Sequence, residues 1–191
     1  PEQLHILSLD VTNEQSVLRA ARMIGETSDS LNLLVNNAGD ARERSQTISD
    51  PMYFDDMLRL YDINALGALR VCHSVMSLLL NAATKTLVNV SSLAASIGTV
   101  TRTNQYGYTM SKAALNMQSK LIHNHHKQSG LRVLAVHPGW MRTNIFGDIS
   151  RMKDAPFEPI QAAENIVKLV ESPPNADDAI FCDAQGHPMS W

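Results

Sequence analysis

Residues 106–116 read YGYTMSKAALN, and the rest of the chain can be placed outward from this stretch. In a helix, Tyr108 and Lys112 lie one turn apart on the same face, so the ammonium group is within reach of the phenol. A free tyrosine has a pKa of about 10, and a nearby cation lowers that pKa by favouring the phenolate. Such a pair can exchange a proton with a carbonyl or alcohol oxygen. Taken alone, the same spacing also fits a surface tyrosine beside a solvated lysine.

Four further motifs flank this stretch. Upstream, an apolar run ends in NNAG at residues 36–39, and Asn64 lies within YDINALG at residues 61–67. Ser91 and Ser92 then close the apolar run LVNV. Downstream, residues 137–143 read HPGWMRT.

Apolar runs alternate with helical periods along the chain. We expect strands at residues 4–10, 31–36, 85–91, 131–136 and 179–182. We expect helices at residues 14–25, 53–80, 108–128 and 159 to 169 or 170. Thr12 is expected to cap the first of these helices. Residues 41–51, 92–105 and 140–157 are expected to be loops. This alternation predicts an α/β fold with a mostly parallel sheet and helices on both faces.

In this order, the motifs Asn-Asn-Ala-Gly, Asn, Ser, Tyr-x-x-x-Lys and Pro-Gly-x-x-x-Thr resemble those of the short-chain dehydrogenase/reductase family. The resemblance covers nearly the whole chain, from about residue 4 to residue 191. The run 106–116 and the ending 183–191 look most like the subgroup of C-signal-factor-like proteins and sniffer-type carbonyl reductases. The resemblance implies a Rossmann-like, doubly wound sheet in a single, partial domain over residues 1–191. It also implies an oxidoreductase that transfers a hydride between NAD or NADP and a ketone, aldehyde or secondary alcohol.

The resemblance assigns catalytic roles to four residues. Tyr108 is expected to be the proton donor and acceptor, and Lys112 to lower the pKa of Tyr108 and bind the nicotinamide ribose. Ser92, rather than Ser91, is expected to donate a hydrogen bond to the substrate oxygen. Asn64 matches a helix asparagine that orients a water chain toward the lysine; a buried asparagine that satisfies backbone groups is the alternative, and the two roles can coexist.

The resemblance also implies three cofactor-binding segments, in addition to Tyr108 and Lys112. They lie beside the adenine ring, along the adenosine ribose, and around the nicotinamide amide and phosphate. Their residues, in that order, are Asp10 and Val11; Asn36, Ala38 and Gly39; and Pro138, Gly139, Met141 and Thr143. A Pro-Gly turn alone would be structural.

The glycine-rich turn that normally holds a pyrophosphate at a helix N-terminus is not found in the sequence. By the resemblance, the strand expected at 4–10 corresponds to the family's third strand, so we expect an N-terminally truncated fold without the first two. Either the chain is part of a longer protein, or it is a natural short variant whose first strand pairs beside residues 31–35. Because this turn is not found, two other functions remain as alternatives: a non-catalytic scaffold or signalling protein, and a nucleotide-sensing regulator.

Composition narrows the class of protein further. Of the 191 residues, 44% are hydrophobic and 18% charged, as in ordinary globular proteins. The net charge of -3, without a block of like charges, does not suggest nucleic-acid binding. No apolar run approaches the roughly 18 residues that are needed to span a membrane. The start of this sequence also lacks the basic and then apolar pattern of a signal peptide. Cys72 and Cys182 are expected to be free thiols, which favours a reducing compartment, by default the cytoplasm.

Two expectations concern metals and partners. His123, His125 and His126 cluster near a helix end, but no cysteine or carboxylate stands at ligand spacing, so we expect no metal. The helices expected at 53–80 and 108–128 carry long apolar faces. By the resemblance these helices form a dimer interface, so we expect a homo-oligomer, either a dimer or a tetramer.

Overall fold

The computed structural model describes residues 4–172 and 180–191. Four parallel strands form one sheet in the order β1-β2-β3-β4. The strands are β1 (Leu33–Asn36), β2 (Thr86–Val90), β3 (Arg132–His137) and β4 (Phe181–Asp183). In β2 and β3, residues such as Leu87, Val88 and Val136 are fully buried, because parallel strands are covered on both faces.

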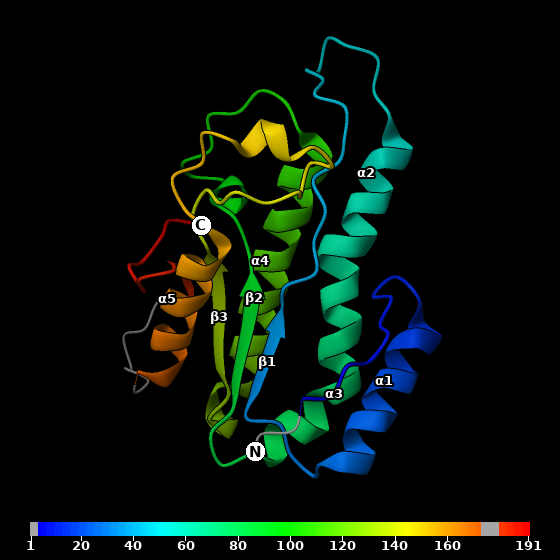
Figure 1. Cartoon of the computed structure of the whole chain (residues 1–191), viewed down its shortest axis with the longest axis vertical. Helices are drawn as coiled ribbons and strands as arrows, with labels where there is room; N and C mark the ends of the chain where they lie inside the picture. Colours follow the sequence, from blue (N-terminus) through cyan, green and yellow to red (C-terminus); the bar gives the residue numbers. More distant parts are fainter. Residues whose placement is uncertain (1–3, 173–179) are drawn as a thin grey trace.

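Helices cover the two faces of this sheet (Figure 1). On one face lie α3 (Ala68–Asn81) and α4 (Tyr106–His126), with α1 (Glu14–Thr27) packed against α3. The opposite face is covered by α5 (Pro159–Glu171), whose Ile166 and Leu169 pack on buried residues of β2 and β3. The predicted α/β class, with a mostly parallel Rossmann-like sheet, is therefore confirmed.

The long helix predicted at 53–80 consists of three segments. The first is α2 (Phe54–Tyr61), the second is a π-helical turn at Asp62–Gly67, and the third is α3. By length and composition this helix, Phe54–Asn81, would be able to span a membrane, which the sequence analysis did not anticipate. Within the protein, however, it buries Leu60, Cys72 and Leu79 completely or nearly so, as the core helix of a globular domain does.

The prediction of a strand at residues 4–10 is wrong. These residues form no strand in the structure, and they do not pair beside β1 as the short-variant hypothesis required. Leu4 and Ile6 are 86% and 87% exposed. An apolar alternation stabilises a strand only where a neighbouring strand accepts its backbone hydrogen bonds, and here none does.

Several predicted boundaries shift by one or two residues. Helix α1 is capped by Asn13, whose Oδ1 accepts a hydrogen bond from the Ser16 amide, and not by Thr12, whose hydroxyl donates to Asp10. Helix α4 begins two residues before the predicted start. The predicted loops contain short 3-10 turns at Leu93–Ala95 and Ile149–Met152. Part of the last predicted strand, residue 179, lies outside the described residues.

Candidate active site

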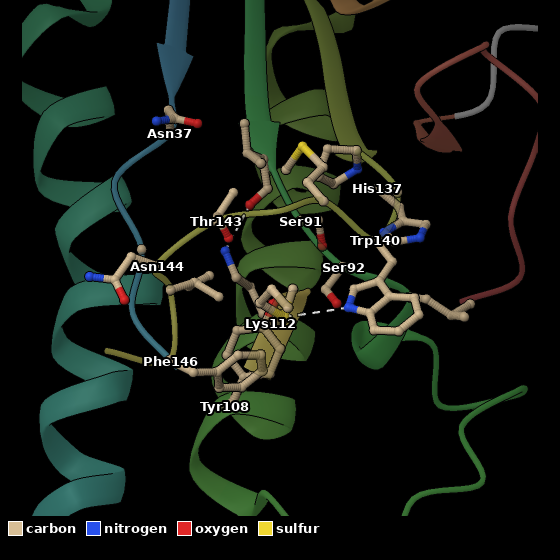
Figure 2. Close-up of a pocket in the computed structure, with 18 of the residues that line it drawn as sticks. Asn37, Ser91, Ser92, Tyr108, Lys112, His137, Trp140, Thr143, Asn144 and Phe146 are labelled. Carbon is tan, nitrogen blue, oxygen red and sulfur yellow. Dashed lines mark hydrogen bonds between the residues drawn. The ribbon is translucent and has the colours of Figure 1, made fainter. Parts of the chain in front are cut away.

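A cavity of about 560 Å³ opens at the carboxyl ends of β2 and β3 (Figure 2). Ligands of open α/β sheets bind at this edge, and the volume suits a small molecule or part of a cofactor. The cavity is lined by the ends of β2 and β3, one face of α4, parts of the loops after β1 and β2, and residues 140–152, which cover it. Lining side chains include Ser91, Ser92, Tyr108, Lys112, His137, Trp140, Thr143, Asn144 and Phe146.

The N-terminus of α4 is held by a residue from a distant loop. Its cap residue, Gln105, has a left-handed backbone (φ 60°) and makes no side-chain cap hydrogen bond. Instead, the carboxylate of Glu43 accepts hydrogen bonds from the amides of Gly107 and Tyr108, at 2.9 and 2.8 Å. A negative charge at this end also complements the helix dipole. The loop after β1 therefore positions the first turn of α4.

Close packing requires a glycine at position 107, between Tyr106 and Tyr108. A Cβ atom at this position would lie 2.9 Å from Glu43 Oε2 and 2.9 Å from Met57 Cα. Only glycine lets α4 approach both α2 and the Glu43 carboxylate this closely.

Tyr108 is buried at the base of the cavity, and burial raises the pKa of its phenol. A side-chain hydrogen bond with Ser92 and the positive charge of Arg102 act in the opposite direction and lower the pKa of Tyr108. Lys112 is not among the groups that lower it. The expected lowering by Lys112 is thus not found in this structure, where Arg102 supplies the nearby positive charge.

Lys112 is buried one turn further along α4. Its Nζ donates a hydrogen bond to the carbonyl oxygen of Val90, at 2.8 Å, and burial lowers its pKa to about 8. The ammonium group is therefore mostly charged at neutral pH. Because it lines the cavity and has further N–H groups, it remains able to bind a ligand hydroxyl.

Asn64 lies behind the cavity in the π-helical turn, a feature that is frequent at functional sites. Its Oδ1 accepts from the Asp40 amide, and its Nδ2 donates to the Asp40 carbonyl and to Ser111 Oγ, all within 2.9 Å. Asn64 thus satisfies backbone groups and ties the β1 loop to α4. A Cβ on Gly39 would lie 3.3 Å from Asn64 Oδ1 and 3.5 Å from Lys112 Nζ, so this glycine leaves room for the lysine.

The predicted cofactor residues fall into two groups. One group lines the cavity: Gly39, Tyr108, Lys112, Pro138, Gly139, Met141 and Thr143. The other group does not: Asp10, Val11, Asn36 and Ala38. Asn36 instead donates to Asn89 Oδ1 (2.8 Å) and Cys72 Sγ (3.1 Å), so it braces β1 against β2 and α3.

The inner part of the cavity fits the nicotinamide end of a dinucleotide. Val90 and Pro138 contribute apolar wall, and Lys112 and Thr143 offer polar groups suited to a ribose and an amide. None of the described lining residues is a carboxylate, so nothing there repels a phosphate.

The two adjacent serines differ in their hydrogen bonds. Ser91 Oγ donates to Asn116 Oδ1 at 2.6 Å and is therefore committed to α4. Ser92 Oγ accepts from the Ala94 amide at 3.1 Å, and its own proton is available to Tyr108 or to a ligand. The choice of Ser92 over Ser91 is consistent with this arrangement.

In the segment that closes the cavity, sequence reasoning identified Met141 and Thr143 but missed Trp140, Asn144 and Phe146. Two of the contacts that hold the covering segment 140–152 in place are hydrogen bonds at the cavity: Trp140 Nε1 donates to Met152 Sδ at 3.4 Å, and the Ala41 amide donates to the Ile145 carbonyl at 3.2 Å. Its Phe146 packs on the cluster that contains Tyr108. No periodicity marks this segment, so the sequence offered no signal. The same is true of Arg102, which lies in an irregular loop.

Comparisons with known proteins agree with this architecture. A family model described as short chain dehydrogenase matches residues 1–154. The C-signal protein of Myxococcus xanthus is 30% identical over 84% of this chain and 93% of its own. An NADPH-bound carbonyl reductase from chicken fatty liver superposes with a TM-score of 0.82 at 29% identity, covering 98% of this chain and 77% of that one. The carbonyl reductase Sniffer of D. melanogaster gives a TM-score of 0.87 at 26% identity, over 98% and 78%.

Proposed function

The chain belongs to the short-chain dehydrogenase family, and we propose that its cavity carries out the reduction of a ketone or aldehyde with Tyr108 as the proton donor. It is an oxidoreductase that uses NAD or NADP. The observation that carries the proposal is the convergence of Tyr108, Ser92 and Lys112 in one cavity at the carboxyl edge of the sheet. The two carbonyl reductases with the same fold support the carbonyl substrate.

In the proposed reaction, the substrate oxygen lies between Tyr108 and Ser92. Ser92 Oγ donates a hydrogen bond that polarises the carbonyl, and the Tyr108 hydroxyl gives its proton to the oxygen. Because burial raises the pKa of Tyr108, the phenol is protonated at neutral pH, as reduction requires. Lys112 would hold the ribose of the dinucleotide, and Asn64 would keep the Lys112 turn in register through Ser111. The dinucleotide, when bound, supplies the hydride.

Replacing Tyr108 by Phe tests this proposal. The variant keeps the buried ring but loses the transferable proton, so carbonyl reduction is expected to fall about 10²- to 10⁴-fold. We would follow NADH and NADPH oxidation with a panel of aldehydes and ketones, and check folding by circular dichroism. Tyr53→Phe is the matched control, because Tyr53 lies under Arg44 and outside the cavity. Unchanged turnover in Tyr108→Phe would refute the assignment.

A second candidate is a non-catalytic scaffold or signalling protein, or a nucleotide-sensing regulator, and the similarity to the C-signal protein favours it. Calorimetric titration of the chain with NADH and NADPH separates the candidates. Binding of the dinucleotide together with hydride transfer to a carbonyl supports the reductase. Binding without hydride transfer supports the nucleotide-sensing regulator, and the absence of binding supports the scaffold. Self-association and a cytoplasmic location are part of the same proposal, and two buried cysteines support the location.

A further inference from the structure

The charge of the cavity is unusual for an acidic chain. Arg102 and Lys112 line it, while none of its described lining residues is Asp or Glu. The chain as a whole carries a net charge of -3. A cleft lined by one sign of charge concentrates ligands of the opposite sign, so this cavity is suited to an anion.

Arg102 lines the cavity without a carboxylate partner among the described residues. Within the part of the chain that the structure describes, no Asp or Glu pairs with it, although four other arginines form such pairs: Arg42, Arg59, Arg70 and Arg142. Arg102 is solvent-exposed and lines the cavity, so it stands where the cavity opens to water. Most of its five N–H donors are therefore free to bind a ligand.

The side chain of Arg102 is nevertheless held in place. Its Nη1 donates to Oε1 of Gln105, which is buried. Among residues 4–172 and 180–191, Gln105 is the one non-glycine residue with a positive φ. Strained backbone of this kind persists where the surrounding structure fixes it, and it clusters at functional sites. The strained residue that starts α4 thus orients a guanidinium group at the cavity mouth.

Arg102 also lies within reach of the reacting groups. Its charge is close enough to Tyr108 to lower the pKa of the phenol, against the larger effect of burial. A substrate whose carbonyl oxygen meets Tyr108 and Ser92 would therefore bring a second substituent toward Arg102. The same cavity is lined by Leu93, Trp140 and Phe146, which suit an apolar or aromatic body.

We propose that Arg102 makes this enzyme prefer carbonyl substrates that carry a carboxylate on an apolar or aromatic scaffold. The guanidinium would bind the carboxylate in a two-pronged, charge-assisted hydrogen bond. This inference rests on the proposed reduction at Tyr108 and names its substrate class. A phosphate of the cofactor is a second possible anion for Arg102, and the experiment separates the two.

The test compares para-carboxybenzaldehyde with its methyl ester, which differ in charge and little in shape. The wild type is expected to favour the acid. In Arg102→Gln, the ratio of kcat/KM for acid over ester should fall about 10- to 100-fold, the effect of losing a hydrogen bond between charged groups. Arg102→Lys should restore part of the ratio, because it keeps the charge but not the fork. Arg22→Gln, which removes an exposed charge from α1, should keep the wild-type ratio.

Two outcomes would overturn the proposal. If Arg102→Gln lowers kcat/KM equally for the acid and the ester, Arg102 does not bind the carboxylate. An increase in the KM for NADPH without a change in the acid-to-ester ratio would assign Arg102 to the cofactor instead.

A binding measurement keeps the test independent of catalysis. Benzoate is titrated into wild type and Arg102→Gln, with the fluorescence of Trp140 in the cavity wall as the signal. Tighter binding to the wild type supports the carboxylate site even if no carbonyl is reduced. Equal affinities would refute the site while leaving the reduction at Tyr108 untouched.

Discussion

At the scale of single residues, the buried charge of Lys112 lowers the stability of the folded protein at neutral pH. Burial lowers its pKa from 10.5 to about 8, so the folded protein holds this proton less tightly than the unfolded chain does. Between these two pH values the unfolded state binds more protons, and stability therefore rises with pH. At 1.36 kcal/mol per pKa unit, the full effect is about 3 kcal/mol. The buried charge is thus a cost that the fold carries at neutral pH.

We therefore predict that urea unfolding of the wild type gives a free energy that rises as the pH increases from about 8 toward 10. Lys112→Met should remove most of this rise, because the titrating group is gone. Lys120→Met, an exposed position two turns along the same helix, should keep it. Tyr108 acts in the opposite direction only near and above the pKa of a free tyrosine, about 10. Parallel pH dependences for Lys112→Met and wild type would contradict the prediction.

At the scale of elements, the contact between α2 and α4 depends on Gly107. In Gly107→Ala the new methyl group would meet the Met57 backbone and the Glu43 carboxylate, both at 2.9 Å. Because the Met57 backbone cannot give way cheaply, we expect a loss of about 1–3 kcal/mol in stability, together with lower activity. Gly25→Ala is the matched control in α1, where nothing lies within 4 Å, and it should stabilise by about 0.5–1 kcal/mol. Thermal unfolding of both variants tests the contrast, and a stabilised Gly107→Ala would contradict it.

Glu43 is the second determinant of this element. Glu43→Gln loses the charge at the helix N-terminus and one of two acceptor oxygens, so we expect about 1–2 kcal/mol less stability. Since Tyr108 lies in the turn that Glu43 holds, kcat for carbonyl reduction should fall as well. Glu164→Gln, exposed on α5, should change neither quantity. Urea unfolding and turnover of the same preparations provide the measurement, and wild-type values for Glu43→Gln would show that the clamp is dispensable.

The same elements show what the sequence could and could not predict. β2 and β3 were predictable because strands buried on both faces read as continuous apolar runs. Residues 4–10 have a similar pattern but gain no neighbouring strand, and pairing is not encoded in the run itself. Tyr108, Lys112 and Ser92 were found because they belong to short contiguous motifs. Phe146 was missed because a long-range contact, between Ala41 and Ile145, holds its loop at the cavity. Arg102 was missed because it lies in an irregular loop without a motif.

At the scale of the whole molecule, apolar surface remains on the helices that were expected to form a dimer interface. Leu58 on α2 is 67% exposed and Leu121 on α4 is 60% exposed. Exposed apolar surface that accumulates on neighbouring elements marks interaction sites, and α2 and α4 pack against each other. Most soluble oligomers are closed and symmetric, so a second copy of the chain is the expected partner.

We predict that light scattering gives the mass of a dimer or tetramer at micromolar concentration, and that Leu121→Glu shifts it toward the monomer. A charge placed at the centre of an apolar contact has to be desolvated without a partner, which costs several kcal/mol on each subunit. Ile160→Glu is the matched control, because Ile160 is 64% exposed but lies on α5, at the opposite face of the sheet. It should leave the mass unchanged. A wild type that is only monomeric, or an equal response to the two substitutions, would contradict an interface built on α2 and α4.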